Sequence, residues 1–139
     1  MSRIVVIDDE PVLRLTFRLI LEQDGHEVWD AENGKVGVDI CRHERPDLVI
    51  TDIMMPEQEG IETLTILHDE FPDLPIIAMS GAGVDMTPRA RKALNGYTYV
   101  AKPVEKPVLL ELVRNVLVKN DDHNRGDVTT LGEDGGSDR

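Results

Sequence analysis

The chain has 139 residues, 40% of them hydrophobic, which is enough to fill one core and too few for several domains. Its formal net charge of −12 repels phosphate backbones and anionic lipids, so the composition argues against direct binding to nucleic acid or to a membrane surface. No apolar run approaches the roughly 20 residues that span a bilayer, and Met1-Ser2-Arg3 does not begin a signal peptide, so we expect a cytoplasmic protein.

Strand and helix patterns alternate through the first half of the chain. Apolar runs predict strands over residues 3–7, 27–31 and 48–52, and the third strand ends on Asp52. A helix beginning at Pro11 is expected to end at Gly25, where a left-handed residue is favoured, and a second helix to stop before Pro46. The lone cysteine, Cys41, lies in the second helical pattern, and we expect it in the core rather than in a disulfide.

The second half continues the alternation. Strands are predicted over residues 75–79 and 97–101, and helices over 61–71, from Pro88 to about 94, and from about 105. Five strands alternating with helices are typical of a parallel sheet covered on both faces, an α/β fold. From about residue 120 the chain is nearly without apolar residues, so we predict a folded domain over 1–119 and a disordered acidic tail over 120–139.

Polar residues follow four of the predicted strands: Asp8 and Asp9, Asp52, Ser80, and Lys102. In an open α/β sheet, ligands bind at the carboxyl edge of the strands, so these groups are expected to converge. Three carboxylates in one place require a hard cation, and a few oxygen ligands with retained water suit Mg²⁺. A lysine and a hydroxyl beside that cation would complete a site for a phosphoryl group, with a carboxylate as the nucleophile that forms an aspartyl phosphate.

These residues carry a family resemblance. The pairs and motifs that recur in family-like order are Asp8-Asp9, Thr51-Asp52 with Pro56 and Gly60, Ser80-Gly81, and Tyr99 with Lys102-Pro103. Across residues 3 to about 119 the chain resembles the receiver domain of bacterial two-component response regulators, in the single-domain form of the chemotaxis regulators. The resemblance implies a flavodoxin-like (βα)5 three-layer sandwich with a parallel sheet of strand order 2-1-3-4-5.

The resemblance also implies a phosphoacceptor and its metal site. Asp52 would accept a phosphoryl group from a phosphohistidine of a sensor histidine kinase or a histidine phosphotransfer protein. Asp9 would coordinate Mg²⁺ directly, Asp8 mostly through water, and the main-chain carbonyl of Met54 would supply a further oxygen. We expect the chain to phosphorylate and dephosphorylate itself in this way without being a turnover enzyme.

A switch is implied on the other side of the acceptor. Lys102 would pair with Asp52 and then with a phosphoryl oxygen, and the peptide bond before Pro103 would be cis. Ser80 would move to the new phosphoryl group while the ring of Tyr99 turns inward. The altered surface would comprise the fourth helix, fifth strand and fifth helix, which would bind a downstream target protein or support onward transfer.

One position departs from the family pattern in the turn before the fifth strand. A glycine usually precedes the switch aromatic by four residues, whereas this chain has Asn95 there and Gly96 next. Because asparagine tolerates the left-handed conformation, we expect the turn to be retained.

Two other interpretations stay open at this point, and a third is disfavoured by the sequence. The chain could be the receiver fragment of a longer regulator with an output domain, or a pseudo-receiver that binds partners without phosphorylation. A phosphatase of the haloacid dehalogenase type also forms an aspartyl phosphate, but its Asp-x-Asp pattern is missing from Asp8-Asp9-Glu10-Pro11. We expect a monomer, with a dimer through the fourth helix, fifth strand and fifth helix as the alternative.

Overall fold

Five strands alternate with five helices in the part of the chain that the computed structural model describes, residues 2–53, 59–81 and 88–129, with side chains at all of these except 59 and 120–129. In chain order the elements are β1 (Arg3–Ile7), α1 (Pro11–Gln23), β2 (Glu27–Ala31), α2 (Gly34–Glu44), β3 (Leu48–Asp52), α3 (Glu59–Glu70), β4 (Ile76–Ser80), α4 (Pro88–Leu94), β5 (Thr98–Ala101) and α5 (Lys106–Thr129).

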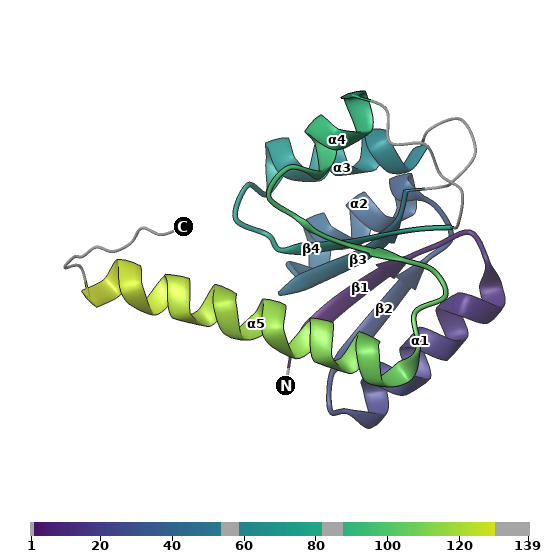
Figure 1. Cartoon of the computed structure of the whole chain (residues 1–139), viewed down its shortest axis with the longest axis horizontal. Helices are drawn as coiled ribbons and strands as arrows, with labels where there is room; N and C mark the ends of the chain where they lie inside the picture. The colour runs from purple at the N-terminus through teal and green to yellow at the C-terminus, as the bar shows by residue number, and fades with distance from the viewer. Residues whose placement is uncertain (1, 54–58, 82–87, 130–139) are drawn as a thin grey trace.

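The strands form one parallel sheet in the order β2-β1-β3-β4-β5, which confirms the predicted order. Figure 1 shows α1 and α5 on one face of this sheet and α2, α3 and α4 on the other. The strand order reverses direction between β1 and β3, and in folds of this kind the ligand site lies at the carboxyl edge of the sheet at that point.

The sheet is buried on both faces because its central strands are continuous apolar runs. In β1, Ile4 and Val6 pack with Phe17 of α1, whereas Val5 and Ile7 belong to the core on the α2 and α3 side. These four of the five β1 side chains are fully buried. Burial on both faces keeps the strands rigid, so the residues that follow them leave a fixed platform.

Cys41 lies in the core, as predicted, and its side chain is fully buried. Burial raises the pKa of its thiol to about 12. The thiol therefore stays protonated at neutral pH and acts as a small apolar side chain.

The turns show where left-handed backbone is needed. Gly25 has φ of 94°, as expected at the end of α1. Before β5 the positive φ of 91° falls on Gly96 and not on Asn95, so the turn is kept by the neighbouring glycine. Arg45 at the end of α2 also adopts a left-handed conformation, with φ of 51°, which the sequence did not indicate.

The last helix is longer than predicted. α5 continues to Thr129, so residues 120–129 are helical where a disordered tail was expected, and residues 130–139 lie outside the described part. The yellow end of α5 extends beyond the sheet in Figure 1. No proline interrupts the helix between Pro107 and Thr129, and it continues through the largely polar stretch that follows Val118. The domain boundary at residue 119 stays a prediction. Within the described residues, no helix is long and apolar enough to cross a membrane.

Candidate functional site

The carboxyl ends of the central strands are aligned by main-chain hydrogen bonds beyond the strands themselves. The Ile53 N–H donates to the Met79 carbonyl at 2.9 Å, which aligns the end of β3 with the end of β4. The Lys102 N–H donates to the Ser80 carbonyl at 2.7 Å, which does the same for β4 and β5. Asp52, Ser80 and Lys102 therefore leave the sheet at one edge.

Lys102 joins the acidic residues of two strands. Its Nζ lies 2.9 Å from Oδ2 of Asp8 and 2.7 Å from Oδ2 of Asp52. Asp8 is 0% and Asp52 2% exposed, so these are charge-assisted hydrogen bonds from a partly exposed ammonium to buried carboxylates. The exposed carboxylate of Glu10, which was not predicted as a site residue, lies 3.6 Å from the same Nζ. The structure thus brings Asp8, Asp52 and Lys102 together as the sequence predicted.

Burial and hydrogen bonding shift the pKa of Asp8 in opposite directions. Its Oδ1 accepts the Glu10 N–H at 2.8 Å, and its own N–H donates to the Ala31 carbonyl at 3.1 Å. Burial raises the pKa of the Asp8 carboxyl more than the hydrogen bonds from Glu10 and Lys102 lower it. Burial thus makes the charged form of this carboxylate less favourable than in water, even with the Lys102 ammonium beside it.

Lys102 is held in its charged form. Burial lowers the pKa of its ammonium, but the hydrogen bonds and charges of Asp52 and Asp8 together outweigh this and raise the pKa above its ordinary value. The Lys102–Pro103 peptide bond is cis, the conformation that the resemblance implies.

The acidic cluster fits a divalent cation. One carboxylate oxygen from each of Asp8, Asp9 and Asp52 lies within 4.8 Å of the others, and Asp9 is exposed. When ionised, the three carboxylates contribute −3 and the Lys102 ammonium +1, which leaves −2, the charge that a divalent cation balances. An all-oxygen donor set is the kind that Mg²⁺ prefers. Met54, predicted to add a main-chain oxygen, lies outside the described residues.

Ser80 and Tyr99 are in contact. Their hydroxyl groups form a hydrogen bond, with Ser80 fully buried at the end of β4. Tyr99 on β5 remains 41% exposed, so its hydroxyl reaches inward while much of the ring faces solvent. The structure thus brings together the two residues that the resemblance pairs as a switch.

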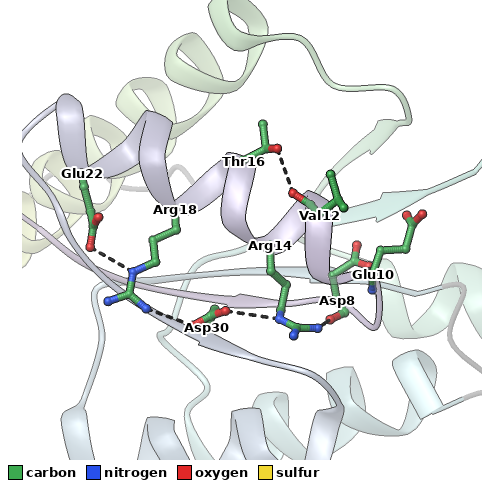
Figure 2. A network of polar contacts seen from close by, with 8 residues as sticks. All are labelled: Asp8, Glu10, Val12, Arg14, Thr16, Arg18, Glu22 and Asp30. Carbon is green, nitrogen blue, oxygen red and sulfur yellow. Dashed lines mark hydrogen bonds and ion pairs between the residues drawn. The ribbon is translucent and has the colours of Figure 1, made fainter.

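A second polar network lies beside the acidic loop, and its residues were not predicted as site residues. Figure 2 shows Arg14 between the main-chain carbonyl of Asp8 and the carboxylate of Asp30, with Arg18 on the other oxygen of Asp30. One signal was available, because an arginine near the amino end of a helix is unfavourable for the helix dipole unless it has a partner. The contact with its partner Asp30 on β2 depends on how α1 packs against the sheet.

Comparison with known proteins identifies a family whose model matches most of this chain. The family model described as the response regulator receiver domain matches residues 4–114. Protein PilH of Pseudomonas aeruginosa is 34% identical over 84% of this chain and 98% of its own length. Sporulation initiation phosphotransferase F of Bacillus subtilis is 30% identical over 84% of this chain and 94% of its own.

Solved structures and longer relatives extend the comparison. A CheY-like receiver domain protein from Methanospirillum hungatei has a TM-score of 0.80 and 29% identity, covering 88% of this chain and 98% of its own. The chain spans 46% of the probable transcriptional regulatory protein TcrX of Mycobacterium tuberculosis, at 32% identity. Because the family model covers most of the folded part, this chain belongs to the response regulator receiver domain family.

Proposed function

We propose that Asp52 accepts a phosphoryl group from a phosphohistidine of a sensor histidine kinase or a histidine phosphotransfer protein. Receiver domains serve as phosphoacceptors in two-component systems, and the observation that carries the proposal here is the placement of Asp52. Its carboxylate ends a buried strand, lies 2.7 Å from the Lys102 ammonium and shares an acidic cluster with Asp8 and Asp9. In the transfer, a carboxylate oxygen bonds to phosphorus, the P–N bond breaks, and the imidazole nitrogen keeps the electron pair and takes up a proton.

The surrounding residues would bind Mg²⁺ and compensate the charge of the phosphoryl group. Asp9 would bind Mg²⁺ directly, Asp8 through water, and the Met54 carbonyl would add a ligand; when bound, this ion would neutralise phosphoryl oxygens. Lys102 already holds the Asp52 carboxylate, and a phosphoryl group there would present new oxygens to the same ammonium. The chain would not turn over a free substrate, because the phosphoryl group stays on Asp52 until water or a relay partner removes it.

The hydroxyl groups of Ser80 and Tyr99 would couple phosphorylation of Asp52 to a change at the surface. If the Ser80 hydroxyl moves to donate to a phosphoryl oxygen, it leaves the Tyr99 hydroxyl, whichever of the two groups donates in the present bond. Loss of the Ser80 partner would release Tyr99, a residue that is already 41% exposed, to a new position. The surface formed by α4, β5 and α5 would then differ between the two states, for binding a target protein or for onward transfer.

One observation favours a second setting for the same chemistry. The chain matches receivers in longer regulators such as TcrX, in which it spans less than half of the relative. As part of a longer regulator, the same surface would act on an output domain of its own protein. The acceptor chemistry would be unchanged in either setting.

The test is phosphotransfer from a panel of histidine kinases and phosphotransfer proteins that carry labelled phosphohistidine. We expect label to move to the native chain in Mg²⁺, with Asp52→Asn as the matched control that keeps the shape of the side chain and removes the nucleophile. Transfer to Asp52→Asn at the native rate would contradict the proposal. Failure of every donor with a folded native chain would favour the pseudo-receiver.

A further inference from the structure

The polar network on α1 holds the acidic loop by its backbone. Arg14 donates from Nη1 to the Asp8 carbonyl at 2.7 Å and from Nε to Oδ2 of Asp30 at 3.2 Å. The Arg14 main-chain N–H also donates to the Glu10 carbonyl, at 3.1 Å. Arg14 thus contacts the loop on either side of Asp9. Its side chain bonds the Asp8 carbonyl, as Figure 2 shows, and its main-chain N–H makes an ordinary i to i−4 helical hydrogen bond to Glu10.

Asp30 holds the Arg14 guanidinium in place. Its Oδ1 accepts Nη1 of Arg18 at 3.1 Å, while Arg18 Nε bonds Glu22 at 3.0 Å. The Arg14 side chain is 16% exposed and that of Asp30 29%, so this pair is shielded more than an ordinary surface pair. Asp30 also cancels the charge of Arg14, so the guanidinium can lie beside the acidic cluster without strongly repelling a dication.

Holding the Asp8 carbonyl fixes more than Asp8. The carbonyl and the N–H of Asp9 belong to one planar peptide unit, so the orientation of that plane sets where the Asp9 backbone leaves the loop. Asp9 is the exposed member of the acidic cluster, whereas Asp8 is held separately by Lys102 and by the Glu10 N–H. Arg14 therefore acts chiefly on Asp9, the exposed member of the acidic cluster.

We propose that Arg14 is a positioning residue that orients the Asp8–Asp9 peptide for Mg²⁺ binding, with Asp30 as its anchor. This inference rests on the proposed function of the acidic site. Residues that orient metal ligands from outside the coordination sphere typically change metal affinity by about 10- to 100-fold when they are removed. We expect a loss at the lower end of that range, because the other carboxylates remain.

The experiment compares the full-length native chain with Arg14→Met and with Arg18→Met as the matched control. Arg18 is an arginine of the same helix and binds the same Asp30, but its contacts are with Asp30 and Glu22 and not with the acidic loop. Isothermal calorimetry with Mg²⁺ should show a dissociation constant weakened about tenfold in Arg14→Met and unchanged in Arg18→Met. In metal-free protein, the Asp9 and Glu10 amides of Arg14→Met should exchange hydrogen faster than in the native chain.

A further readout separates positioning from general stability. The phosphorylation rate of Arg14→Met should be reduced at low Mg²⁺ and restored at saturating Mg²⁺, whereas a generally destabilised chain would not recover. If Arg14→Met fails to fold, Arg14→Lys takes its place, because a single ammonium cannot reproduce the forked contact and should give an intermediate loss. Native Mg²⁺ affinity and exchange in these variants, or an equal loss in Arg18→Met, would overturn the inference.

The outcomes also separate this inference from the proposed function. A native chain that is phosphorylated on Asp52, with Arg14→Met equal to it in Mg²⁺ affinity, would overturn the role of Arg14 alone. A native chain that binds Mg²⁺ but accepts no phosphoryl group, with weaker Mg²⁺ binding in Arg14→Met, would overturn the proposed function and support the role of Arg14.

Discussion

At the scale of single residues, the charge balance of the site depends on Lys102. Its ammonium bonds two carboxylates that are almost fully buried, Asp8 and Asp52. Breaking a buried ion pair by removing one partner leaves an uncompensated charge, which costs more than the pair itself contributes. Without a metal ion, Lys102 is the cation bonded to both of these carboxylates.

Lys102→Met should therefore destabilise the metal-free chain by about 3 kcal/mol, measured by urea unfolding in a chelator. Saturating Mg²⁺ should recover part of this loss, because the ion compensates the same carboxylates. The raised pKa of Lys102 means that its contribution is fully present below an ordinary pKa of about 10.4 and is lost as the pH rises above it. The difference between native and variant should thus be constant from about pH 7 to about pH 9.

The control for this variant is Lys106→Met, at an exposed lysine in the first turn of α5, which should change stability by less than about 0.5 kcal/mol. A loss in Lys102→Met that is the same in chelator and in Mg²⁺ would contradict the view that ammonium and metal ion serve the same carboxylates.

The residues that the sequence predicts are those whose chemistry follows directly from a strand end. Asp8, Asp52 and Lys102 could be placed because parallel strands bring their carboxyl ends to one edge. Arg14 and Asp30 could not, since their contact depends on the rotation of α1 about its axis and on its distance from β2. Tertiary docking of that kind leaves no spacing pattern in the sequence.

At the scale of elements, α3 closely approaches the end of β3 that carries Asp52. The sequence predicts the third helix over 61–71, which leaves Gly60 outside it, but Gly60 lies in α3 and is buried. A Cβ added there would lie 2.7 Å from the Asp52 carbonyl oxygen, closer than ordinary packing allows. The glycine therefore serves the close approach of the helix to the end of β3.

Gly60→Ala should destabilise the chain by about 1–3 kcal/mol, because the added methyl group meets main-chain atoms that cannot move independently. It should also slow phosphorylation of Asp52, since the carbonyl it contacts belongs to the acceptor residue. Thermal unfolding and phosphorylation rates would be compared with Gly81→Ala, where nothing lies within 4 Å of the added methyl group. Equal behaviour of the two variants would show that the approach of α3 to β3 is not tight.

Element bounds differ in how well the sequence predicts them. The strands β1, β2 and β3 have the predicted bounds, and in β1 and β3 polar residues follow a continuous apolar run. Helix ends were less certain. α2 begins at Gly34 because the Asn33 side chain accepts the Val36 N–H at 2.9 Å. α5 continues to Thr129 although its continuous apolar stripe ends near Val118. A helix end that is set by one capping side chain, or that lies beyond the apolar stripe, is not marked by the hydrophobic periodicity of the sequence.

At the scale of the whole molecule, the site exists only when the chain is folded. Lys102 and Asp8 are 94 residues apart in sequence, and Lys102 and Asp52 are 50 apart. The sheet joins them by placing β1 and β3 side by side at the centre, with helices over both faces (Figure 1). In the function that we propose, a rigid sheet would let a change of charge at Asp52 act on residues at this edge while the core stays fixed.

The central claim is that Asp52 is a phosphoacceptor that depends on Mg²⁺. The most direct measurement is the intact mass of the chain after incubation with acetyl phosphate, for the native chain and Asp52→Asn, each in Mg²⁺ and in chelator. We expect the mass of one added phosphoryl group in the native chain with Mg²⁺, and none in the other three samples. A folded native chain that binds Mg²⁺ but gains no mass, or an equal gain in Asp52→Asn, would contradict the claim.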